Sequence, residues 1–408
     1  MKRVIFLFVF LSICVVAESK TKRLKCVVEF PSRDNGVVVD ALPEWVRGAT
    51  VWCDGEEIPS QLDDLDDDGR PDELAFVYEG MDESYLGVSV GERALRKEFQ
   101  ILLSSNPIEH NYQPRVNAQM WLKNADKSLE EVTVAHSLKD DMYRKLHHHG
   151  PAFESERAAY RVYFDKKQSI DTYGKKSERL ELRETNWYTT DEQLARGYGH
   201  DNIRVFGSIS VGVLKGWDAR RREMTHITEM RRREARIRAA GPVRTIVDMR
   251  VEGWRYRGRE IDMTSRYILF AGHTDVRVEN HLSGDLTGLE FTTGVMKIRD
   301  GYHATLRDSV LLSTGSDYPE NDSVRWERER VMLAVALPGR QIVGRADDKK
   351  SHLVQLAADS RGRIDYRLWM FWQKSEWLNS EDWLSPQGMA RMGGWSYEML
   401  SPVIVELK

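Results

Sequence analysis

Short apolar stretches separated by Gly, Asp and Pro run through most of the chain. In the first hundred residues they include LKCVVEF, GVVVDAL, ATVWCDG and ELAFVYEG. Farther along they lengthen and alternate between apolar and polar positions, as in EARIRA, SRYILFAG and RVMLAVALPG. A period of two is typical of strands that bury one face and expose the other. We therefore predict a mainly β protein, in which a small β-sandwich at residues 18–108 precedes a large two-sheet antiparallel β-sandwich at residues 109–408.

The first residues show a different pattern, that of a secretory signal. A basic start at residues 1–3 precedes an apolar run from Val4 to Val16, and Ala17 is a suitable small residue for cleavage. We therefore predict a signal peptide at residues 1–17. The apolar run is too short to remain as a membrane-spanning helix. We expect a secreted or periplasmic protein without a stable membrane span, with a lipoprotein anchor on Cys14 as the alternative.

The cysteine count adds one expectation. The chain has 3 Cys, of which Cys14 would be lost with the signal peptide. Cys26 and Cys53 would then share an oxidising compartment on neighbouring strands. This placement favours a disulfide between them.

Charge limits the class of partner. The formal net charge is −4 over 408 residues, so the chain as a whole has no general attraction to nucleic acid. Between Arg220 and Arg266, however, 14 Arg accompany 7 acidic residues. Arg binds carboxylate and sulfate groups through two parallel hydrogen bonds. Most of these Arg should form cross-strand pairs on an exposed sheet face, and a few would suit an anionic ligand.

An acidic segment, QLDDLDDDGRPDE at residues 61–73, interrupts the predicted small β-sandwich. Acidic residues at alternate positions followed by a Gly reproduce the first half of a calcium loop. The Glu that closes an EF-hand is absent, because Ala75 occupies that position. We predict a structural Ca²⁺ site, against the alternative of an acidic solvated turn, and we expect no organic cofactor. The predicted metal ligands are Asp64, Asp66, Asp68 and Asp72.

The most informative stretch runs from Tyr143 to Lys175 and contains three consecutive His. Gly150-Pro151 follows them, and Pro disfavours helical backbone in the residue before it, so the His should lie on a loop or strand end. The next residues alternate as a strand would. One face would carry Ala158, Tyr160, Val162 and Phe164, and the other Arg157, Ala159, Arg161 and Tyr163.

A glycine-rich stretch at residues 186–218 includes the bend GYGHD, whose backbone freedom suits a loop that folds over a ligand. Together the two stretches predict a site in a cleft of the large sandwich. The candidate catalytic residues are His147, His148, His149, Tyr163, Tyr173, Tyr198 and His200. The candidate substrate-binding residues are Arg157, Arg161, Tyr160, Asp201 and Trp187.

Three motifs, HHHGPAFESERAAYRVYFDKKQSIDTYGK, NWYTTDEQLARGYGHD and DLDDDGRPDELAF, resemble a domain-of-unknown-function family of secreted proteins. That family occurs in polysaccharide-degrading bacteria, encoded beside pectin- and ulvan-degrading enzymes. The resemblance covers nearly all of the chain after the signal. It implies a large β-sandwich of the galactose-mutarotase-like type behind a small β domain, and an oligosaccharide dehydratase that acts in ulvan breakdown. The chain departs from the family pattern after His200-Asp201, where a Lys-Val-Gly run is missing.

The candidate residue types fit this chemistry. Dehydration of a non-reducing-end uronate removes the C5 proton and expels the 4-hydroxyl, which gives a 4,5-unsaturated sugar. Arg157 or Arg161 would neutralise the carboxylate, and His148 or His149 with a Tyr partner would serve as base and acid. A lyase performs the same elimination with a sugar as leaving group. We therefore predict an enzyme acting on an anionic oligosaccharide, with a β-eliminating lyase or a non-catalytic carbohydrate-binding protein as alternatives and a hydrolase third.

Overall fold

A computed structural model describes residues 19–408, apart from residues 32–33, 41, 81–94, 139–140, 320–321, 379–383, 386, 392–393 and 395–399. The predicted signal peptide and Cys14 lie outside the described residues. Strands make up 50% of the structure and helices 6%, which confirms the prediction of a mainly β protein. None of the helices in the described part has the length and apolarity needed to cross a membrane.

The N-terminal strands form two antiparallel sheets around one hydrophobic cluster. The first sheet has the order β29 (Ile404–Leu407), β1 (Thr21–Phe30), β7 (Leu95–Ser104), β3 (Gly48–Cys53) and β4 (Glu56–Ile58). The second has the order β2 (Gly36–Val39), β6 (Glu73–Val77) and β5 (Ser60–Asp63). Buried alternate residues such as Val28, Phe76 and Phe99 fill the space between them.

The rest of the chain builds three further main antiparallel sheets, one of nine strands and two of five. The nine-stranded sheet has the order β11 (Val134–Ser137), β18 (Arg232–Ala240), β19 (Arg244–Tyr256), β20 (Arg259–Phe270), β21 (Val276–Gly284), β28 (Arg363–Trp372), β25 (Glu329–Ala336), β24 (Val310–Asp317) and β23 (Tyr302–Leu306). One five-stranded sheet has the order β15 (His200–Asp201), β14 (Ile170–Gly174), β13 (Ala158–Val162), β12 (Ala152–Ser155) and β8 (Val116–Gln119). The other has the order β17 (Glu223–Thr225), β16 (Lys215–Asp218), β22 (Phe291–Met296), β27 (Ser351–Leu356) and β26 (Ile342–Asp347).

The remaining elements are short. A two-stranded ribbon joins β9 (Trp121–Lys123) and β10 (Leu129–Glu131). The helices α1 (Leu182–Thr185) and α2 (Asp191–Ala195) and the 3₁₀ turns η2 (His147–His149) and η4 (Gly339–Gln341) lie in connections between strands. None of these four described elements exceeds 5 residues, so strands dominate the described architecture.

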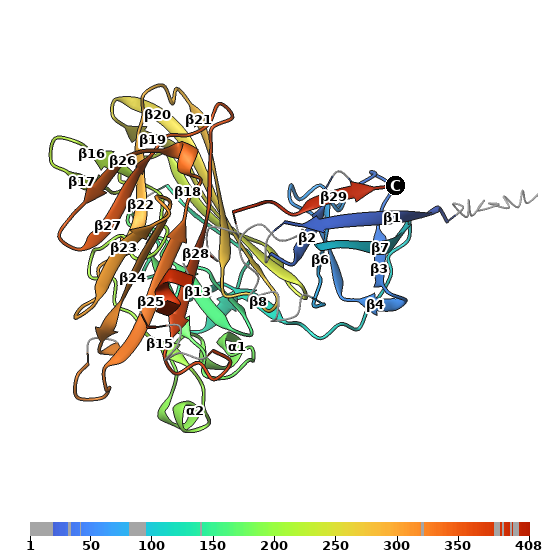
Figure 1. Cartoon of the computed structure of the whole chain (residues 1–408), viewed down its shortest axis with the longest axis horizontal. Helices are drawn as coiled ribbons and strands as arrows, with labels where there is room; N and C mark the ends of the chain where they lie inside the picture. Colours follow the sequence, from blue (N-terminus) through green and yellow to red (C-terminus); the bar gives the residue numbers. More distant parts are fainter. Residues whose placement is uncertain are drawn as a thin grey trace, which may run out of the picture.

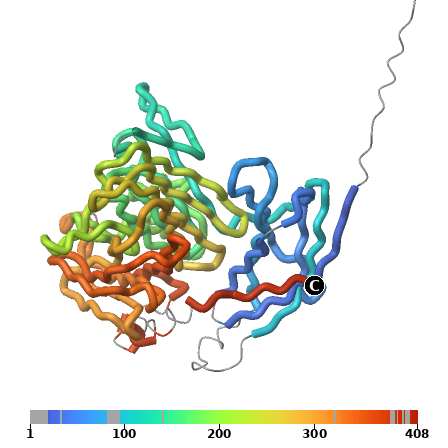
Figure 2. The backbone as a smooth tube through the Cα atoms, turned by 90° about the horizontal axis from the view of Figure 1, so that it is seen from above, coloured from blue at the N-terminus to red at the C-terminus, as the bar shows by residue number. Residues whose placement is uncertain are grey.

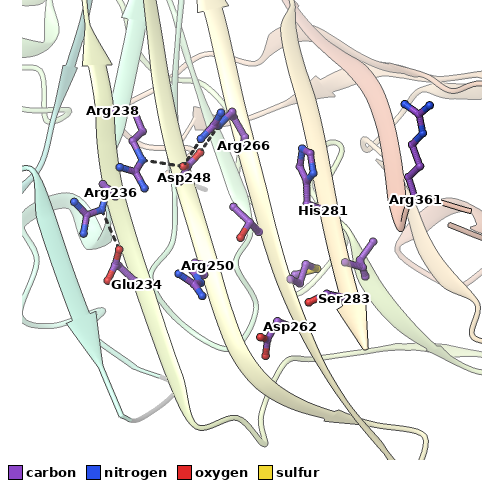
Figure 3. Close-up of a pocket in the computed structure, with 13 residues that line it drawn as sticks. Glu234, Arg236, Arg238, Asp248, Arg250, Asp262, Arg266, His281, Ser283 and Arg361 are labelled. Carbon is purple, nitrogen blue, oxygen red and sulfur yellow. Dashed lines mark hydrogen bonds and ion pairs between the residues drawn. The ribbon is translucent and has the colours of Figure 1, made fainter. Parts of the chain in front are cut away.

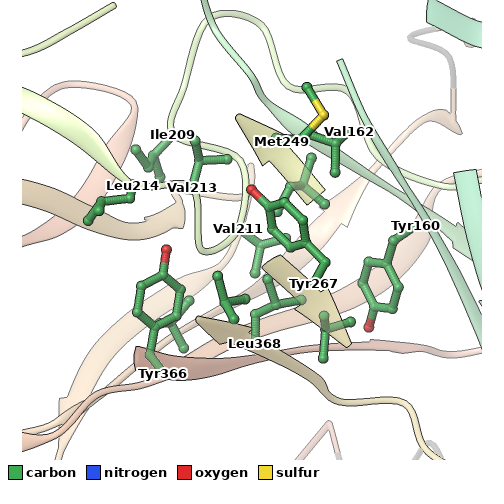
Figure 4. Close-up of a cluster of buried hydrophobic side chains, with 14 of the residues drawn as sticks. Tyr160, Val162, Ile209, Val211, Val213, Leu214, Met249, Tyr267, Tyr366 and Leu368 are labelled. Carbon is green, nitrogen blue, oxygen red and sulfur yellow. The ribbon is translucent and has the colours of Figure 1, made fainter. Parts of the chain in front are cut away.

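The main hydrophobic core lies between the nine-stranded sheet and the two five-stranded sheets. Figure 4 shows Tyr160 and Val162 of β13 near Met249 of β19, Tyr267 of β20 and Leu368 of β28. These side chains are buried and come from both sides of the sandwich. The arrangement confirms the predicted large antiparallel β-sandwich.

The N-terminal sheets lie beside the large sandwich, against the outer face of its nine-stranded sheet (Figure 1). Val77 packs there with Ile246 and Phe270. Buried ion pairs accompany this apolar contact: the Asp34 carboxylate accepts from Arg277 Nη2 at 2.6 Å and also from Arg367. A buried charge is stable only when it is paired. These pairs therefore fix how the N-terminal sheets sit on the large sandwich.

The last strand of the chain returns to the N-terminal sheets. Glu29 of β1 lies opposite Ile404 of β29, and Cys26 lies opposite Leu407. Figure 2 shows this strand, in red, alongside the blue N-terminal strands. The predicted division between residues 108 and 109 stays a prediction, but the segment Ile404–Leu407 pairs with the N-terminal sheet.

The expected disulfide between Cys26 and Cys53 is absent, and both thiols are free and buried. The sheet order explains this. Strand β7 lies between β1 and β3, and Phe99 of β7 is the register partner of both cysteines. Two strand spacings separate the Cα atoms by about 9.5 Å, beyond the ~7 Å that a disulfide tolerates. The sequence indicated strands that are near one another, but it did not reveal the strand inserted between them.

Candidate active site

Strand β13 presents its two faces to different environments. Tyr160 points into the main core, where its hydroxyl donates to the Thr274 carbonyl at 2.5 Å. Arg161 lies on the opposite face, beside its register partner Asp171 on β14. The alternation of the sequence predicts this separation. Tyr160, a candidate substrate-binding residue, therefore lies on the face opposite Arg161 and outside the candidate site.

Two segments cover the Arg161 face. One is η2 with its three His, and the other is the connection after α1 that carries Trp187 and Tyr188. We expected a loop or strand end at the His, and the structure instead has one short 3₁₀ turn interrupted at His148. The turn ends at Gly150, where an added Cβ would lie 1.9 Å from the Val162 carbonyl oxygen. Only Gly permits the turn to approach β13 so closely.

The backbone of both covering segments is strained. His148, His149 and Trp187 have φ angles of 42°, 73° and 73°. Residues other than Gly rarely adopt positive φ angles, and residues that do so concentrate at functional sites. All three of these strained residues are candidate site residues of the sequence analysis.

Arg161 is the centre of a polar cluster, which we call the Arg161 cluster: Arg161, Tyr163, Asp171, Asp201, His149 and Tyr188. Its Nη2 donates to Asp171 Oδ2 at 2.5 Å, to Tyr163 OH at 3.0 Å and to Asp201 Oδ2 at 3.1 Å. Within the described part of the chain, its Nη1 makes two contacts, both long: with Tyr188 OH at 3.4 Å and with the His148 carbonyl at 3.5 Å. Nη1 is therefore the donor best placed to bind an added anion.

His149 has a defined tautomer. Its Nδ1 lies 2.8 Å from the Tyr143 carbonyl oxygen, and the two rings stack with centroids 3.6 Å apart. A carbonyl oxygen only accepts hydrogen bonds, so Nδ1 carries the proton and Nε2 has the lone pair. Nε2 lies 3.4 Å from Tyr188 OH. Burial and the nearby Arg161 charge lower the pKa of His149, so the ring is neutral at neutral pH.

The other two His differ in accessibility. His148 is 0% exposed, and neither ring nitrogen has a hydrogen-bond partner among the described residues. Burial, followed by the Arg161 charge, lowers the pKa of His148 well below its usual value. His147 is half-buried, and burial with Lys123 lowers its pKa as well. His149 is the His best placed for proton transfer, because its free nitrogen faces the Tyr188 hydroxyl.

The Asp201 carboxyl has a raised pKa. Burial, followed by the Asp171 carboxylate, raises the pKa of Asp201 to about 7. Its Oδ2 accepts from Trp187 Nε1 at 3.0 Å as well as from Arg161. Asp201 therefore changes charge close to neutral pH, beside the guanidinium that would bind an anion. Both Asp201 and Trp187 were candidate binding residues, and the structure brings them to the Arg161 cluster.

The candidate residues His200 and Arg157 lie outside the Arg161 cluster. His200 precedes Asp201 on β15 and so faces the opposite side, where its Nε2 lies 3.0 Å from Glu329 Oε2. Arg157 precedes β13 and donates to Glu178 at 2.6 Å and to the Gly272 carbonyl at 2.9 Å. The alternation of strand residues separates His200 from Asp201, although the motif made both look like parts of one site.

Tyr173 and Tyr198 have structural partners. The Tyr173 hydroxyl contacts Glu181 Oε2 at 2.9 Å and donates to the Gly199 carbonyl at 2.8 Å, and its ring packs edge-on against Trp187. It thus supports the segment that covers Arg161. The Tyr198 hydroxyl donates to Glu184, and Arg179 stacks on its ring at 3.7 Å. Neither hydroxyl faces the Arg161 cluster.

Sequence reasoning missed Tyr143, Asp171 and Tyr188 as site residues. Asp171 had a usable signal, because a hairpin from β13 to β14 places it opposite Arg161. Tyr188 follows Trp187 directly and is 47% exposed, the most accessible member of the Arg161 cluster. Its position depends on the turn after α1, where Asn186 and Trp187 have positive φ. No periodicity in the sequence predicts that turn.

The acidic loop, residues 64–72, brings three of its four predicted ligands together. Carboxylate oxygens of Asp64, Asp66 and Asp72 lie within 4.8 Å of one another. Asp68 is separate from this group and accepts from the Arg70 backbone N–H at 2.8 Å. The Gly69 N–H donates to Asp64 at 2.8 Å, which stabilises the turn that the Gly predicted. Hard oxygen ligands of this kind suit Ca²⁺.

Residues 35–386 match a protein family described as a domain of unknown function (DUF4861). No curated protein sequence matches the chain. Among solved structures, similar chains include a protein of glycosyl hydrolase family 38 from Enterococcus faecalis, at 8% identity and a TM-score of 0.45. Another is an α-mannosidase from Enterococcus faecalis V583, at 8% identity and a TM-score of 0.43. Each alignment covers 95% of this chain and about half of the other, 47% and 46%.

Proposed function

The chain belongs to the DUF4861 family, and from the Arg161 cluster we propose that it removes water from the non-reducing-end uronate of an anionic oligosaccharide. The reaction breaks the C5–H and C4–O bonds and forms a 4,5 double bond. It requires a base for the C5 proton, an acid for the departing hydroxyl and a cation for the carboxylate. The Arg161 cluster has one residue in a suitable position for each role.

His149 is the proposed base, and its geometry carries the proposal. The Tyr143 carbonyl holds the proton on Nδ1, so Nε2 presents a lone pair beside Tyr188 and Arg161. The lowered pKa keeps the ring neutral and able to accept a proton at neutral pH. We therefore assign the base to His149 and not to His148, because His148 is wholly buried.

Tyr188 is the proposed acid. Its hydroxyl lies 3.4 Å from both His149 Nε2 and Arg161 Nη1. It gives its proton to the departing 4-hydroxyl, which leaves as water, while the Arg161 charge stabilises the resulting phenolate. The protonated His149 then returns the C5 proton to Tyr188. Every proton is accounted for, and both residues regain their initial state.

Arg161 is the proposed partner of the substrate carboxylate. The C5 proton becomes acidic only when the adjacent carboxylate is neutralised, and Nη1 is the guanidinium donor with the weakest protein contacts. Asp171 and Tyr163 hold the opposite side of the guanidinium at 2.5 and 3.0 Å. The Arg is thereby oriented before the substrate arrives, which lowers the cost of binding.

Hydrolysis is a second candidate because two carboxylates flank one Arg nitrogen. Asp171 and Asp201 both accept from Arg161 Nη2, and a carboxyl with a pKa of about 7 suits a general acid. Against this, Asp171 also accepts from the Tyr163 hydroxyl and Asp201 also accepts from Trp187 Nε1, so both carboxylates already have several donors. The other acidic pair of this region is also engaged, since Glu154 binds Lys175 and Glu156 binds Arg115.

Mass spectrometry of a uronate-terminated oligosaccharide after incubation with the protein tests this proposal. A dehydratase yields an intact oligomer lighter by one water, with the ultraviolet absorbance of a conjugated double bond. Cleavage into an unsaturated and a saturated fragment would indicate a lyase, and cleavage with gain of water would indicate a hydrolase. An unchanged oligomer that nevertheless binds would indicate a carbohydrate-binding protein.

A further inference from the structure

A groove lies on the outer face of the nine-stranded sheet, across β18, β19, β20 and β21 (Figure 3). Its volume is about 430 Å³, within the range of ligand-binding pockets. Five Arg and three carboxylates line it, a balance opposite to that of the whole chain. We call it the arginine groove after its five Arg, which are Arg236, Arg238, Arg250, Arg266 and Arg361.

One cross-strand row of the groove is already neutralised. Arg236, Asp248 and Arg266 are successive register partners on β18, β19 and β20. Arg266 donates to both Asp248 oxygens, at 2.8 and 2.9 Å. Cross-strand pairs of opposite charge stabilise a sheet face. This row therefore has a structural role.

The acidic loop contributes to the same end of the groove. Asp67 Oδ2 accepts from Arg236 Nη1 at 2.7 Å and from Arg238 Nη1 at 2.5 Å. These bonds connect the N-terminal sheets to the large sandwich at the edge of the groove. They also occupy two of its five Arg.

The next row has a different character. Arg250, Thr264 and His281 are successive register partners on β19, β20 and β21. Arg250 is 53% exposed, and its ion pair with Glu252 is long, at 3.4 Å. Exposed Arg361, from the turn between β27 and β28, lies on the opposite side of His281 from Arg250 (Figure 3). Two guanidinium groups, a hydroxyl and an imidazole thus line this row. Glu234, the register partner of Arg250 on β18, is paired with Arg232 and Arg236.

We propose that the arginine groove is a second, non-catalytic binding site for an anionic saccharide chain, whose carboxylate or sulfate groups pair with Arg250 and Arg361. Guanidinium groups bind both anions through parallel hydrogen bonds, and Thr264 and His281 add further polar contacts. The groove is formed by strands different from those that carry the Arg161 cluster. The saccharide nature of the ligand rests on the proposed function, whereas its negative charge follows from the groove.

Calorimetric titration of the full chain with a chondroitin sulfate octasaccharide tests the site. Unsulfated chondroitin of the same length separates carboxylate from sulfate recognition, and cellooctaose is the uncharged control. The test variant combines Arg250→Ser and Arg361→Ser. Both side chains are exposed, so folding should be unchanged, which a melting curve verifies. Arg96→Ser, an Arg 59% exposed on β7, is the matched control.

We expect the double variant to lose about tenfold or more in affinity for a charged octasaccharide, a loss that corresponds to about 1.4 kcal/mol. Added salt should weaken wild-type binding by screening, and Arg96→Ser should bind as wild type does. Equal affinity of wild type and double variant, or wild-type binding of cellooctaose as tight as that of the charged octasaccharides, would overturn the proposal. Failure of the proposed function has a separate signature, because the groove would still bind when no uronate oligomer loses water.

Discussion

The backbone carbonyl of Tyr143 lies 2.8 Å from Nδ1 of His149. This one contact assigns the tautomer of the ring and leaves Nε2 as the basic nitrogen. The same two residues stack at 3.6 Å, so the ring plane is fixed as well. A neutral, oriented imidazole beside an Arg and a Tyr is the arrangement on which the proposed elimination depends.

The Asp201 carboxyl should make substrate binding depend on pH. Its pKa is raised to about 7, so it is largely neutral below that pH and negative above it. The added charge, 3.1 Å from Arg161, would repel a substrate carboxylate. We predict that KM for a uronate oligomer rises as pH increases through about 7, and that Asp201→Asn removes this rise. A KM that keeps the same pH dependence in Asp201→Asn would contradict the assignment.

Tyr188→Phe should lower kcat because it removes the proposed acid. Loss of a general acid typically reduces the rate by ~10²–10⁴. The side chain is 47% exposed, so the melting temperature should change little. Tyr302→Phe, on a Tyr 54% exposed on β23, is the matched control and should retain full turnover. Similar kcat values for the two variants would exclude Tyr188 as the acid.

The acidic loop should respond to Ca²⁺. Binding to the folded state alone stabilises it by about 2.7 kcal/mol at a hundredfold excess over Kd. We therefore predict a higher melting temperature in Ca²⁺ than in a chelator. Asp64→Asn should abolish the difference, whereas Asp68→Asn should largely retain it, because Asp68 lies outside the group of converging oxygens. Identical melting curves with Ca²⁺ and chelator would indicate a solvated acidic turn.

Asp34 should make the stability of the contact between the N-terminal sheets and the large sandwich depend on pH. Burial alone would raise the pKa of its carboxyl, but Arg277 and Arg367 lower it below the usual range. The stabilisation is therefore present above the unfolded-state pKa of about 4 and is lost as pH falls through the folded-state value. Removing one member of a buried pair costs about 3–5 kcal/mol. We predict that Asp34→Ala melts lower than wild type at pH 7, and that the difference narrows under acid; a constant difference would argue against the ion pair.

Much of the fold follows from local patterns. The period of two predicts long strands, and the structure has them at β19 (Arg244–Tyr256) and β20 (Arg259–Phe270), although the first half of β19 is buried on both faces. Pairing between distant segments is less accessible, because many registers satisfy the same alternation. This is why the sequence did not indicate that β7 separates Cys26 from Cys53, or that β29 pairs with β1.

The residues of the candidate site were likewise only partly predictable from the sequence. The alternation along residues 157–164 and the adjacent His motif indicated Arg161, Tyr163 and His149 from the sequence. Tyr160 and His200 lie outside the Arg161 cluster, because successive side chains of β13 and of β15 point to opposite faces. Tyr188 could not be predicted, because two successive residues with positive φ set its direction.

The turnover of His149→Gln measures the central claim most directly. Gln cannot accept the C5 proton as imidazole does, so we predict that kcat for dehydration of a uronate-terminated oligomer falls by ~10²–10⁴. His136→Gln, on an exposed His of β11, is the matched control and should retain full turnover. Both rates are read as formation of the conjugated double bond, on variants with wild-type melting temperatures. Full turnover by a folded His149→Gln would contradict the proposed mechanism.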